Sequence, residues 1–332
     1  MRILKNNALD SSKWEELLTK NEFSSPFQTQ EFYKLFNSIS GYSADVFTVE
    51  ENNIYTSLIV VVIQKEKGIK GLFSIRGIVY GGPLILSSQN DSLEYLLTKL
   101  KRNYKSKLIY LEIRNHFDYS LFSQTFLKSN YKFVEHLNVQ LNIENQDIET
   151  IFSGMNSTRR RQIRLSFKQG ALAREANNEN EVKELYRILE KMYHEQVKLP
   201  LLPYKFFINL YRSKIGKVFV ALHDNKIIGG AFCIYYPNTT MNTFYYTDIR
   251  GYHKKIYPAH IALKEAIDFG IKNKLKIVDF MGAGKPNVEY GVRDYKMRFG
   301  GDLVKDGRYM IIFKPLMYNF GMLGLKILSK LK

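Results

Sequence analysis

The sequence predicts a mixed α/β protein with two similar halves, each a mixed, mostly antiparallel sheet flanked by helices. The length of 332 residues exceeds the ~250–300 residues at which a single core stops growing, so we expect two domains. The order strand, strand, helix, strand, helix, strand, strand also occurs twice, at an offset of roughly 170 residues. A hydrophobic content of 45% is enough for two packed cores and excludes a largely disordered chain.

The first repeated pattern is a pair of strands joined by a polar turn. DVFTVEENNIYTSLIVVVIQ (45–64) and KVFVALHDNKIIGGAFCIYY (217–236) both begin near Val-Phe, turn through asparagine-containing residues and end in a long apolar run. The second pattern is a helix followed by a buried strand. Segments 91–114 and 260–283 share it, because apolar residues recur there at helical spacing before a β-rich run.

The third pattern is a helix end followed by two strands, in segments 126–143 and 295–313. In the second copy, Asp306-Gly307 predicts a two-residue hairpin turn between these strands. Each half also opens with helical segments, namely 11–18 and 25–38 in the first half, then 157–170 and 180–197 in the second. We therefore expect two similar domains at 1–148 and 149–315, separated near the polar NIENQDIE, and a basic amphipathic helix at 316–332.

The charge balance favours polyanionic partners. With 49 Lys and Arg against 32 Asp and Glu, the net charge of +17 suits RNA, an anionic membrane surface or phosphate-bearing substrates. Lysines that merely solvate the surface explain it equally well, since they are scattered. The single Cys233 and the six histidines show no disulfide or metal-ligand spacing, so we expect no metal. Without a signal peptide or a span of ~18 apolar residues, we expect a soluble cytoplasmic protein, a monomer or weak dimer.

Four stretches occur in an order that resembles a known family. They are SSPFQTQEFYKLF, GIVYGGPLI, STRRRQIRLSFKQG, and YPAHIALKEAIDFGIKNKLKIVDFMGA followed by YGVRDYKMRFGG. With them the chain resembles the FemABX-type aminoacyltransferases, FemAB-like members of the GNAT (Gcn5-related N-acyltransferase) superfamily in its acetyltransferase-6 branch. The resemblance implies tandem GNAT-like domains that move an amino acid from aminoacyl-tRNA onto an amine of a peptidoglycan precursor. The long coiled-coil insertion of some members has no counterpart here.

Two residues are candidates for catalysis. The resemblance implies that Lys296, in YGVRDYKMRFGG, lies near the aminoacyl ester and stabilises the oxyanion that forms during aminolysis. The alternative is a solvated lysine at a helix C-terminus, like Lys128 at the matching place of the first half. Asp279, at the end of a buried strand, either orients or deprotonates the acceptor amine, or caps the following turn.

Other cationic and phenolic side chains are candidates for substrate binding. Tyr290, Arg293 and Tyr295 share the segment of Lys296 and suit a phosphate or carboxylate. A cluster of arginines on one predicted helix suits tRNA or pyrophosphate, or else forms a solvated helix face; its members are Arg159, Arg160 and Arg164. Arg76, in SIRGIVYGGP, is a candidate for an acidic group of the acceptor.

The identity of the acyl donor is the main open question. CoA-dependent GNAT enzymes cradle pyrophosphate on a glycine-rich turn before a helix. Here TDIRGYHKKIYPAHI keeps Arg250-Gly251 but lacks a second glycine, and Pro258 removes one N–H donor. We therefore expect no cofactor and an aminoacyl-tRNA donor. The alternative is an acyl-CoA or acyl-carrier-dependent N-acyltransferase acting on an amino sugar in surface polysaccharide biosynthesis. A third hypothesis is a non-catalytic basic module that binds RNA or membrane.

The C-terminus KPLMYNFGMLGLKILSKLK combines apolar residues with terminal lysines. Such a helix suits peripheral contact with the inner leaflet at the cytoplasmic face of the membrane, where an anionic, lipid-linked cell-envelope precursor would reside. The alternative is an ordinary terminal helix that packs against the second domain.

Overall fold

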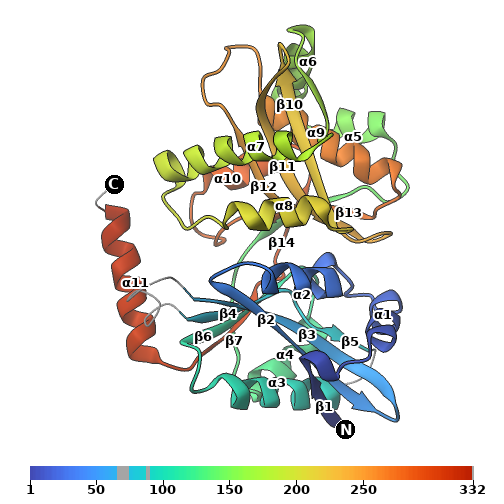
Figure 1. The fold of residues 1–332 in the computed structure, drawn as a ribbon, viewed down its shortest axis with the longest axis vertical. Coiled ribbons are helices and arrows are strands. Elements are labelled where there is room, and N and C mark those ends of the chain that lie inside the picture. Colours follow the sequence, from blue (N-terminus) through green and yellow to red (C-terminus); the bar gives the residue numbers. More distant parts are fainter. Residues whose placement is uncertain (66–74, 87–89, 331–332) are drawn as a thin grey trace. The chain divides into compact units, whose positions relative to one another are not determined.

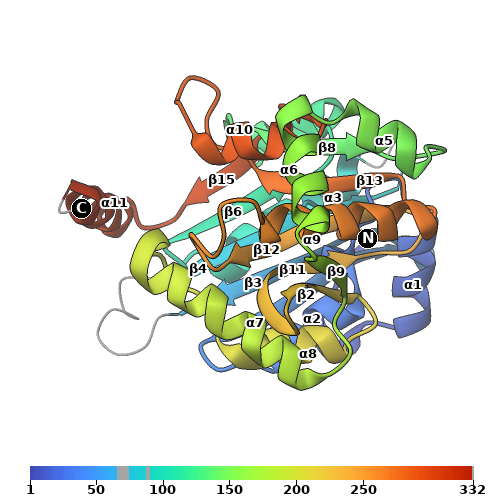
Figure 2. The same ribbon diagram turned by 90° about the horizontal axis from the view of Figure 1, so that it is seen from above.

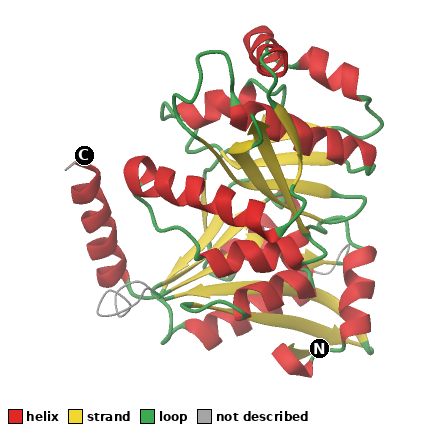
Figure 3. Cartoon of the chain, turned by 45° about the horizontal axis from the view of Figure 1, so that its top comes forward, coloured by secondary structure: helices red, strands yellow, loops and turns green. Residues whose placement is uncertain are grey.

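The structure, a computed structural model, describes residues 1–65, 75–86 and 90–330. The chain forms two compact units. The first unit comprises 1–136 with 305–332, and the second comprises 137–304. Each unit contains one mixed sheet with helices against it, as the sequence predicts (Figure 3).

The sheet of the first unit has the strand order β1-β2-β3-β4-β6-β15-β7, with β5 paired to β3. Among its described strands, β4 and β6 run parallel and the other neighbours antiparallel. The strands are β1 (Arg2–Lys5), β2 (Tyr42–Glu51), β3 (Ile54–Gln64), β4 (Arg76–Gly81), β5 (Leu84–Ile85), β6 (Tyr110–Asn115), β7 (Lys132–Val134) and β15 (Arg308–Ile312).

Helices cover both faces of this first sheet (Figure 1). The helices of the unit are α1 (Ser11–Thr19), α2 (Gln30–Asn37), α3 (Asn90–Tyr104), α4 (Ser123–Lys128) and α11 (Pro315–Lys330). Phe36 of α2 meets Tyr42 of β2, and Tyr104 of α3 meets Phe47 of β2. Because side chains alternate along a strand, Tyr42 and Phe47 point to opposite faces, which places α2 and α3 on opposite sides.

The sheet of the second unit has the strand order β14-β8-β13-β12-β11-β10-β9. Here β12 and β13 are the parallel pair among the described strands, and the other neighbours run antiparallel. The strands are β8 (Asn138–Asn142), β9 (Leu172–Glu175), β10 (Gly216–His223), β11 (Lys226–Tyr235), β12 (Thr240–Asp248), β13 (Ile277–Gly282) and β14 (Asp302–Val304).

Helices also cover both faces of the second sheet (Figure 2). They are α5 (Ile148–Gly154), α6 (Ser157–Lys168), α7 (Glu179–Met192) with the following π-helix η5 (Tyr193–Val197), α8 (Tyr204–Arg212), α9 (Pro258–Lys272) and α10 (Gly291–Met297). A Cβ atom on Gly230 would lie 2.7 Å from Leu185 of α7, and one on Gly229 would lie 2.8 Å from Pro258 of α9. Neighbouring strand residues face opposite sides, so α7 and α9 pack on opposite faces, and these glycines let both helices lie close.

One strand from each half of the sequence belongs to the sheet of the other half. β8 pairs with β13 and β14 in the second unit, whereas β15 lies between β6 and β7 in the first. The hairpin predicted at Asp306-Gly307 is therefore wrong, since β14 and β15 lie in different sheets. Gly307 does turn, with φ of +65°, but strand pairing depends on partners far away in the sequence. For the same reason the second unit spans 137–304 rather than the expected 149–315.

Candidate active site

The parallel strands β12 and β13 stop pairing halfway along their length. Their register runs from Thr240↔Ile277 to Asn242↔Asp279, after which β12 continues to Asp248. β13 instead becomes irregular between Asp279 and Gly282. The unpaired part of β12 is covered by α10, because the rings of Tyr246 and Tyr295 stack with centroids 5.4 Å apart and an interplanar angle of 11°.

Lys296 lies in the last turn of α10 and points back at the irregular end of β13. Its side chain is buried, with 5% exposed, and Nζ donates to the carbonyl oxygens of Gly282 (2.7 Å) and Met281 (3.4 Å). Met281 has φ of +65°, a conformation that is costly for a residue with a side chain. This local strain lets two consecutive carbonyls meet one amine. The alternative of a solvated lysine is therefore wrong for Lys296.

The charge of Lys296 is finely balanced. Burial lowers the pKa of Lys296 to about 8, against the opposing influence of the Asp279 carboxylate. Asp279 is itself buried; it accepts hydrogen bonds from the N–H of Met281 and from the side-chain amide of Gln140, the latter at 3.1 Å. The bond to the N–H two residues ahead is an Asx turn, so the turn-capping role of Asp279 is what the structure shows. Its action on an acceptor amine stays a prediction.

Arg159 of α6 lies beneath α10 and not on an exposed helix face. The side chain is 1% exposed, and its Cζ lies 4.4 Å from the ring centroid of Tyr295 and 4.3 Å from that of Phe299. Nη2 donates to the Tyr295 carbonyl at 3.0 Å, while Nε and Nη1 have no partner among the described residues. Burial lowers the pKa of Arg159. Arg159 thus holds the turn of α10 that carries Lys296.

The other predicted arginines have different surroundings. Arg160 donates to the carbonyls of Ser153 and Met155 and so closes the end of α5. Arg164 is exposed, with its Cζ 5.2 Å from the Phe152 ring centroid. In the first unit, Arg76 of β4 donates from Nε (3.2 Å) and Nη2 (2.9 Å) to the side-chain oxygen of Gln64. Substrate contact by these residues stays a prediction.

Arg293 and Tyr290 shape the loop that precedes α10. Arg293 donates to the carbonyls of Ala283 (2.9 Å) and Val288 (3.0 Å), and to those of Lys285 and Pro286 between them. Its guanidinium therefore fixes the loop. Tyr290, at the N-cap of α10, is 42% exposed, and its ring lies against Gly284, where a Cβ would come within 3.1 Å. Of these two residues, Tyr290 offers the more accessible polar group.

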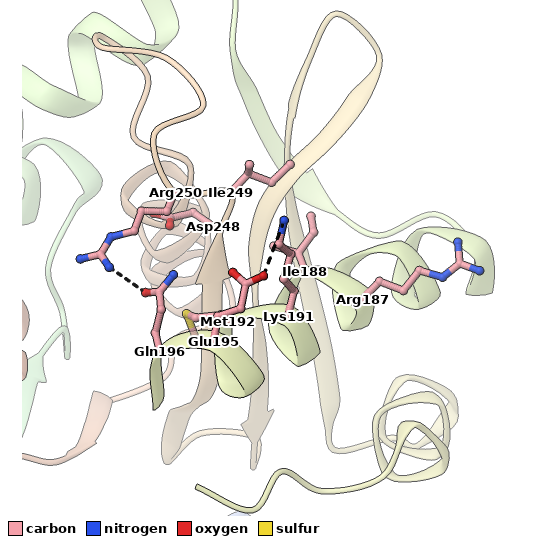
Figure 4. Close-up of a pocket in the computed structure, with 9 residues that line it drawn as sticks. All are labelled: Arg187, Ile188, Lys191, Met192, Glu195, Gln196, Asp248, Ile249 and Arg250. Carbon is pink, nitrogen blue, oxygen red and sulfur yellow. Dashed lines mark hydrogen bonds and ion pairs between the residues drawn. The ribbon is translucent and has the colours of Figure 1, made fainter. Parts of the chain in front are cut away.

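A cavity of about 310 Å³ lies at the end of β12 (Figure 4). It is lined by residues of α7, η5 and the end of β12, namely Arg187, Ile188, Lys191, Met192, Glu195, Gln196, Asp248, Ile249 and Arg250. Arg250 donates to Gln196 at 3.1 Å, and the Arg187 guanidinium points away from the other labelled groups. Burial raises the pKa of Asp248. Burial is also the largest cause of the raised pKa of Tyr295, to which the Asp248 charge adds a smaller shift in the same direction. The cavity and Lys296 therefore belong to one region of the second unit.

Sequence reasoning missed Asp248, although an acidic residue ending an apolar strand just before Arg250-Gly251 was a usable signal. Its carboxylate accepts the N–H of Ala259, in the first turn of α9. The adjacent N–H of Tyr257 donates to Ser166 Oγ at 2.9 Å, and Pro258 has no N–H. The protein itself thus occupies the donors at this helix start that would otherwise face an anion.

His260, in the first turn of α9, is a second residue that the sequence did not single out. Its ring stacks on Tyr257 with centroids 5.1 Å apart, and burial, with Arg159 nearby, lowers the pKa of His260 to about 3. The imidazole is therefore neutral at physiological pH. Nδ1 has no hydrogen-bond partner among the described residues.

Comparison with known proteins gives a family match for most of the second unit. Residues 154–297, which include Arg159, Asp248 and Lys296, match the sequence model of a family described as acetyltransferase (GNAT) domain. A comparison with the sequences of curated proteins found no match. Among solved structures, FemX is similar with a TM-score of 0.75 at 11% identity, over 96% of this chain and 99% of that one.

Two further structures share the fold over both units. The C-terminal domain of a protein described as a lysylphosphatidylglycerol synthetase from Agrobacterium fabrum has a TM-score of 0.62 at 9% identity, covering 97% of this chain and 98% of that one. A tandem GNAT protein from the clavulanic acid biosynthesis pathway has a TM-score of 0.53 at 8% identity, covering 94% and 99%.

The matched family defines the class of one unit: residues 154–297, within the second unit, are an acetyltransferase (GNAT) domain. The chain as a whole shares the fold of FemX, and its two units are folded like tandem GNAT domains, so the predicted resemblance to FemABX-type proteins is confirmed. In the described parts of the chain, no helix combines the length and apolarity needed to cross a bilayer.

Proposed function

We propose that the protein transfers an aminoacyl group from aminoacyl-tRNA to an amine of a peptidoglycan or other cell-envelope precursor, in the cytoplasm and by direct aminolysis. The observation that carries this proposal is the buried amine of Lys296, fixed by two backbone carbonyls at the strained end of β13. A cation held in a low-dielectric site stabilises a developing oxyanion more strongly than one in water. FemX and the lysylphosphatidylglycerol synthetase domain, by their names, support aminoacyl chemistry on this fold.

The reaction balances without a covalent enzyme intermediate. The acceptor amine attacks the ester carbonyl, a C–N bond forms, and the carbonyl oxygen becomes an oxyanion next to the Lys296 ammonium. Collapse of the tetrahedral intermediate breaks the C–O bond to the tRNA ribose. The leaving ribose oxygen gains a proton, and the attacking nitrogen loses one.

The start of α9 supports the choice of aminoacyl-tRNA as the donor. In CoA-dependent GNAT enzymes this helix end receives pyrophosphate, but here Asp248 and Ser166 already accept the N–H groups of Ala259 and Tyr257. A carboxylate at that position also repels phosphate. This arrangement favours aminoacyl-tRNA over acyl-CoA, and the charge of +17 supports a polyanionic donor.

A direct transfer assay tests the proposal. The protein is incubated with a pool of charged tRNAs or with acetyl-CoA, together with soluble and lipid-linked peptidoglycan precursors, and products are identified by mass spectrometry. We expect acceptor mass increases that match amino acids, from charged tRNA only. Transfer from acetyl-CoA alone would establish the alternative acyltransferase instead. If neither donor reacts while the protein still binds RNA, the non-catalytic basic module is the better description.

A further inference from the structure

The C-terminal helix α11 carries a stripe of exposed apolar side chains. Leu316, Phe320 and Leu323 are 76%, 72% and 54% exposed, and Met322, on a different side of the helix, is 50% exposed. Positions i, i+4 and i+7 fall on one side of an α-helix, so the first three form a continuous apolar stripe. Scattered apolar residues are ordinary on a protein surface, whereas an exposed stripe along one helix indicates an interaction surface.

The opposite side of α11 is the side that packs on the first unit. Tyr318 is partly buried, and its ring meets Tyr110 of β6 edge-on, with centroids 5.4 Å apart. Tyr318 follows Leu316 by two residues, which is about 200° around a helix of 3.6 residues per turn. The stripe formed by Leu316, Phe320 and Leu323 therefore points away from the sheet to which α11 is attached.

The charged residues of the C-terminal segment 307–332, which contains α11, are all cationic. After Asp306 the sequence contains no aspartate or glutamate, and its charged side chains are Arg308, Lys314, Lys326, Lys330 and Lys332. A partner that covers the apolar stripe must therefore tolerate, or complement, purely positive charge. A second copy of this chain would bring the same cations and a net charge of +17 against them.

We propose that α11 docks the protein on the surface of an anionic lipid bilayer, lying in the plane of the headgroups with Leu316, Phe320 and Leu323 inserted. Apolar burial and lysine attraction to anionic headgroups act together in such helices. α11 spans Pro315–Lys330, and no helix in the described residues can cross a bilayer, so the contact is peripheral. This inference concerns the first unit and does not depend on the reaction catalysed in the second.

Vesicle co-sedimentation of the full-length protein tests the inference. Wild-type protein is mixed with phosphatidylcholine vesicles that contain or lack phosphatidylglycerol. We expect binding to the anionic vesicles, weaker binding at high salt, and little binding to the neutral ones. The double variant Leu316→Ser/Phe320→Ser should bind anionic vesicles at least about tenfold more weakly than the wild type, because two inserted apolar side chains are lost.

A matched control separates the stripe from general surface hydrophobicity. Leu121 is 87% exposed in the same unit but outside α11, so Leu121→Ser should bind vesicles like the wild type. Equal vesicle binding by the double variant, or no binding by the wild type, overturns the inference. The inference is also overturned if the wild type is a dimer that does not bind vesicles and the double variant is a monomer. In that case the stripe binds a second copy of the chain. Transfer to a soluble acceptor should persist in the double variant, so failure here is distinct from failure of the proposed function.

Discussion

The lowered pKa of Lys296 makes the proposed mechanism testable through pH. The difference between 10.5 and about 8 corresponds to about 3 kcal/mol of preference for the neutral amine in the folded protein. If the ammonium stabilises the oxyanion, kcat is constant below pH 8 and falls about tenfold per further pH unit as the cation is lost. If the neutral amine acted as a base, kcat would instead rise through pH 8.

The assay uses aminoacyl-tRNA with hydroxylamine as the acceptor, because this nucleophile stays uncharged throughout the relevant pH range. Lys296→Met should reduce kcat about 10²–10³-fold, the usual effect of removing one oxyanion-stabilising group. In Lys296→Arg the charge persists at all accessible pH values, so any residual activity should lose the decline above pH 8. A wild-type rate in Lys296→Met, or a rate that increases through pH 8, refutes the assigned role.

The same shift in pKa has a consequence for stability, which provides an activity-independent check. Between pH 8 and pH 10.5 the unfolded chain keeps the proton that folded Lys296 has already released. The free energy of unfolding of the wild type, relative to Lys296→Met, should therefore rise by about 3 kcal/mol across this interval. Urea unfolding at several pH values measures the difference, and a difference independent of pH contradicts the burial argument.

Three further predictions concern the support of the site. Arg159→Met should lower kcat about tenfold with little change in KM for tRNA, because the substitution loosens the last turn of α10. A higher KM for tRNA that also depends less on salt would indicate instead that Arg159 contacts phosphate. Gly301→Ala should lower the free energy of unfolding, measured in urea, by about 1–3 kcal/mol, because the added Cβ would lie 2.9 Å from the Gln140 carbonyl oxygen. Gly291 has open space around it, so Gly291→Ala should change the free energy of unfolding by less than about 0.5 kcal/mol. Asp248→Ala should lower the free energy of unfolding, measured by thermal unfolding, by about 1 kcal/mol, because the contact to the start of α9 is lost. Asp248→Asn keeps an acceptor oxygen and should lower the free energy of unfolding much less.

Local patterns predicted the fold well, whereas long-range pairing did not follow from them. Alternating apolar residues placed the strand pairs at 45–64 and 217–236 close to β2–β3 and β10–β11, because side-chain period and turn residues are properties of a short segment. The exchange of β8 and β15 was missed, since a hairpin signal at Asp306-Gly307 cannot reveal a partner strand nearly two hundred residues away.

The candidate site shows the same limit at the level of side chains. A lysine at a helix end reads as solvated, and only the strained conformation of Met281 reveals why Lys296 is buried. The arginines of α6 look equivalent in sequence. Arg159 is nevertheless fully buried, unlike Arg160 and Arg164, because Arg159 faces α10. Which member of a cluster meets a neighbouring helix depends on packing that composition does not encode.

The duplicated sheet offers an internal comparison that explains why the candidate site lies in the second unit. In the first sheet, the parallel strands β4 and β6 stay paired from Arg76↔Tyr110 to Gly81↔Asn115, and Lys128, at the end of the equivalent helix α4, is exposed. In the second sheet, the parallel pair separates after Asn242↔Asp279. The freed edge of β12 receives the ring of Tyr295, and the freed carbonyls of β13 receive the amine of Lys296. Separation of one strand pair thus turns a solvated lysine into a buried cation with a lowered pKa, which is the property that the proposed chemistry requires.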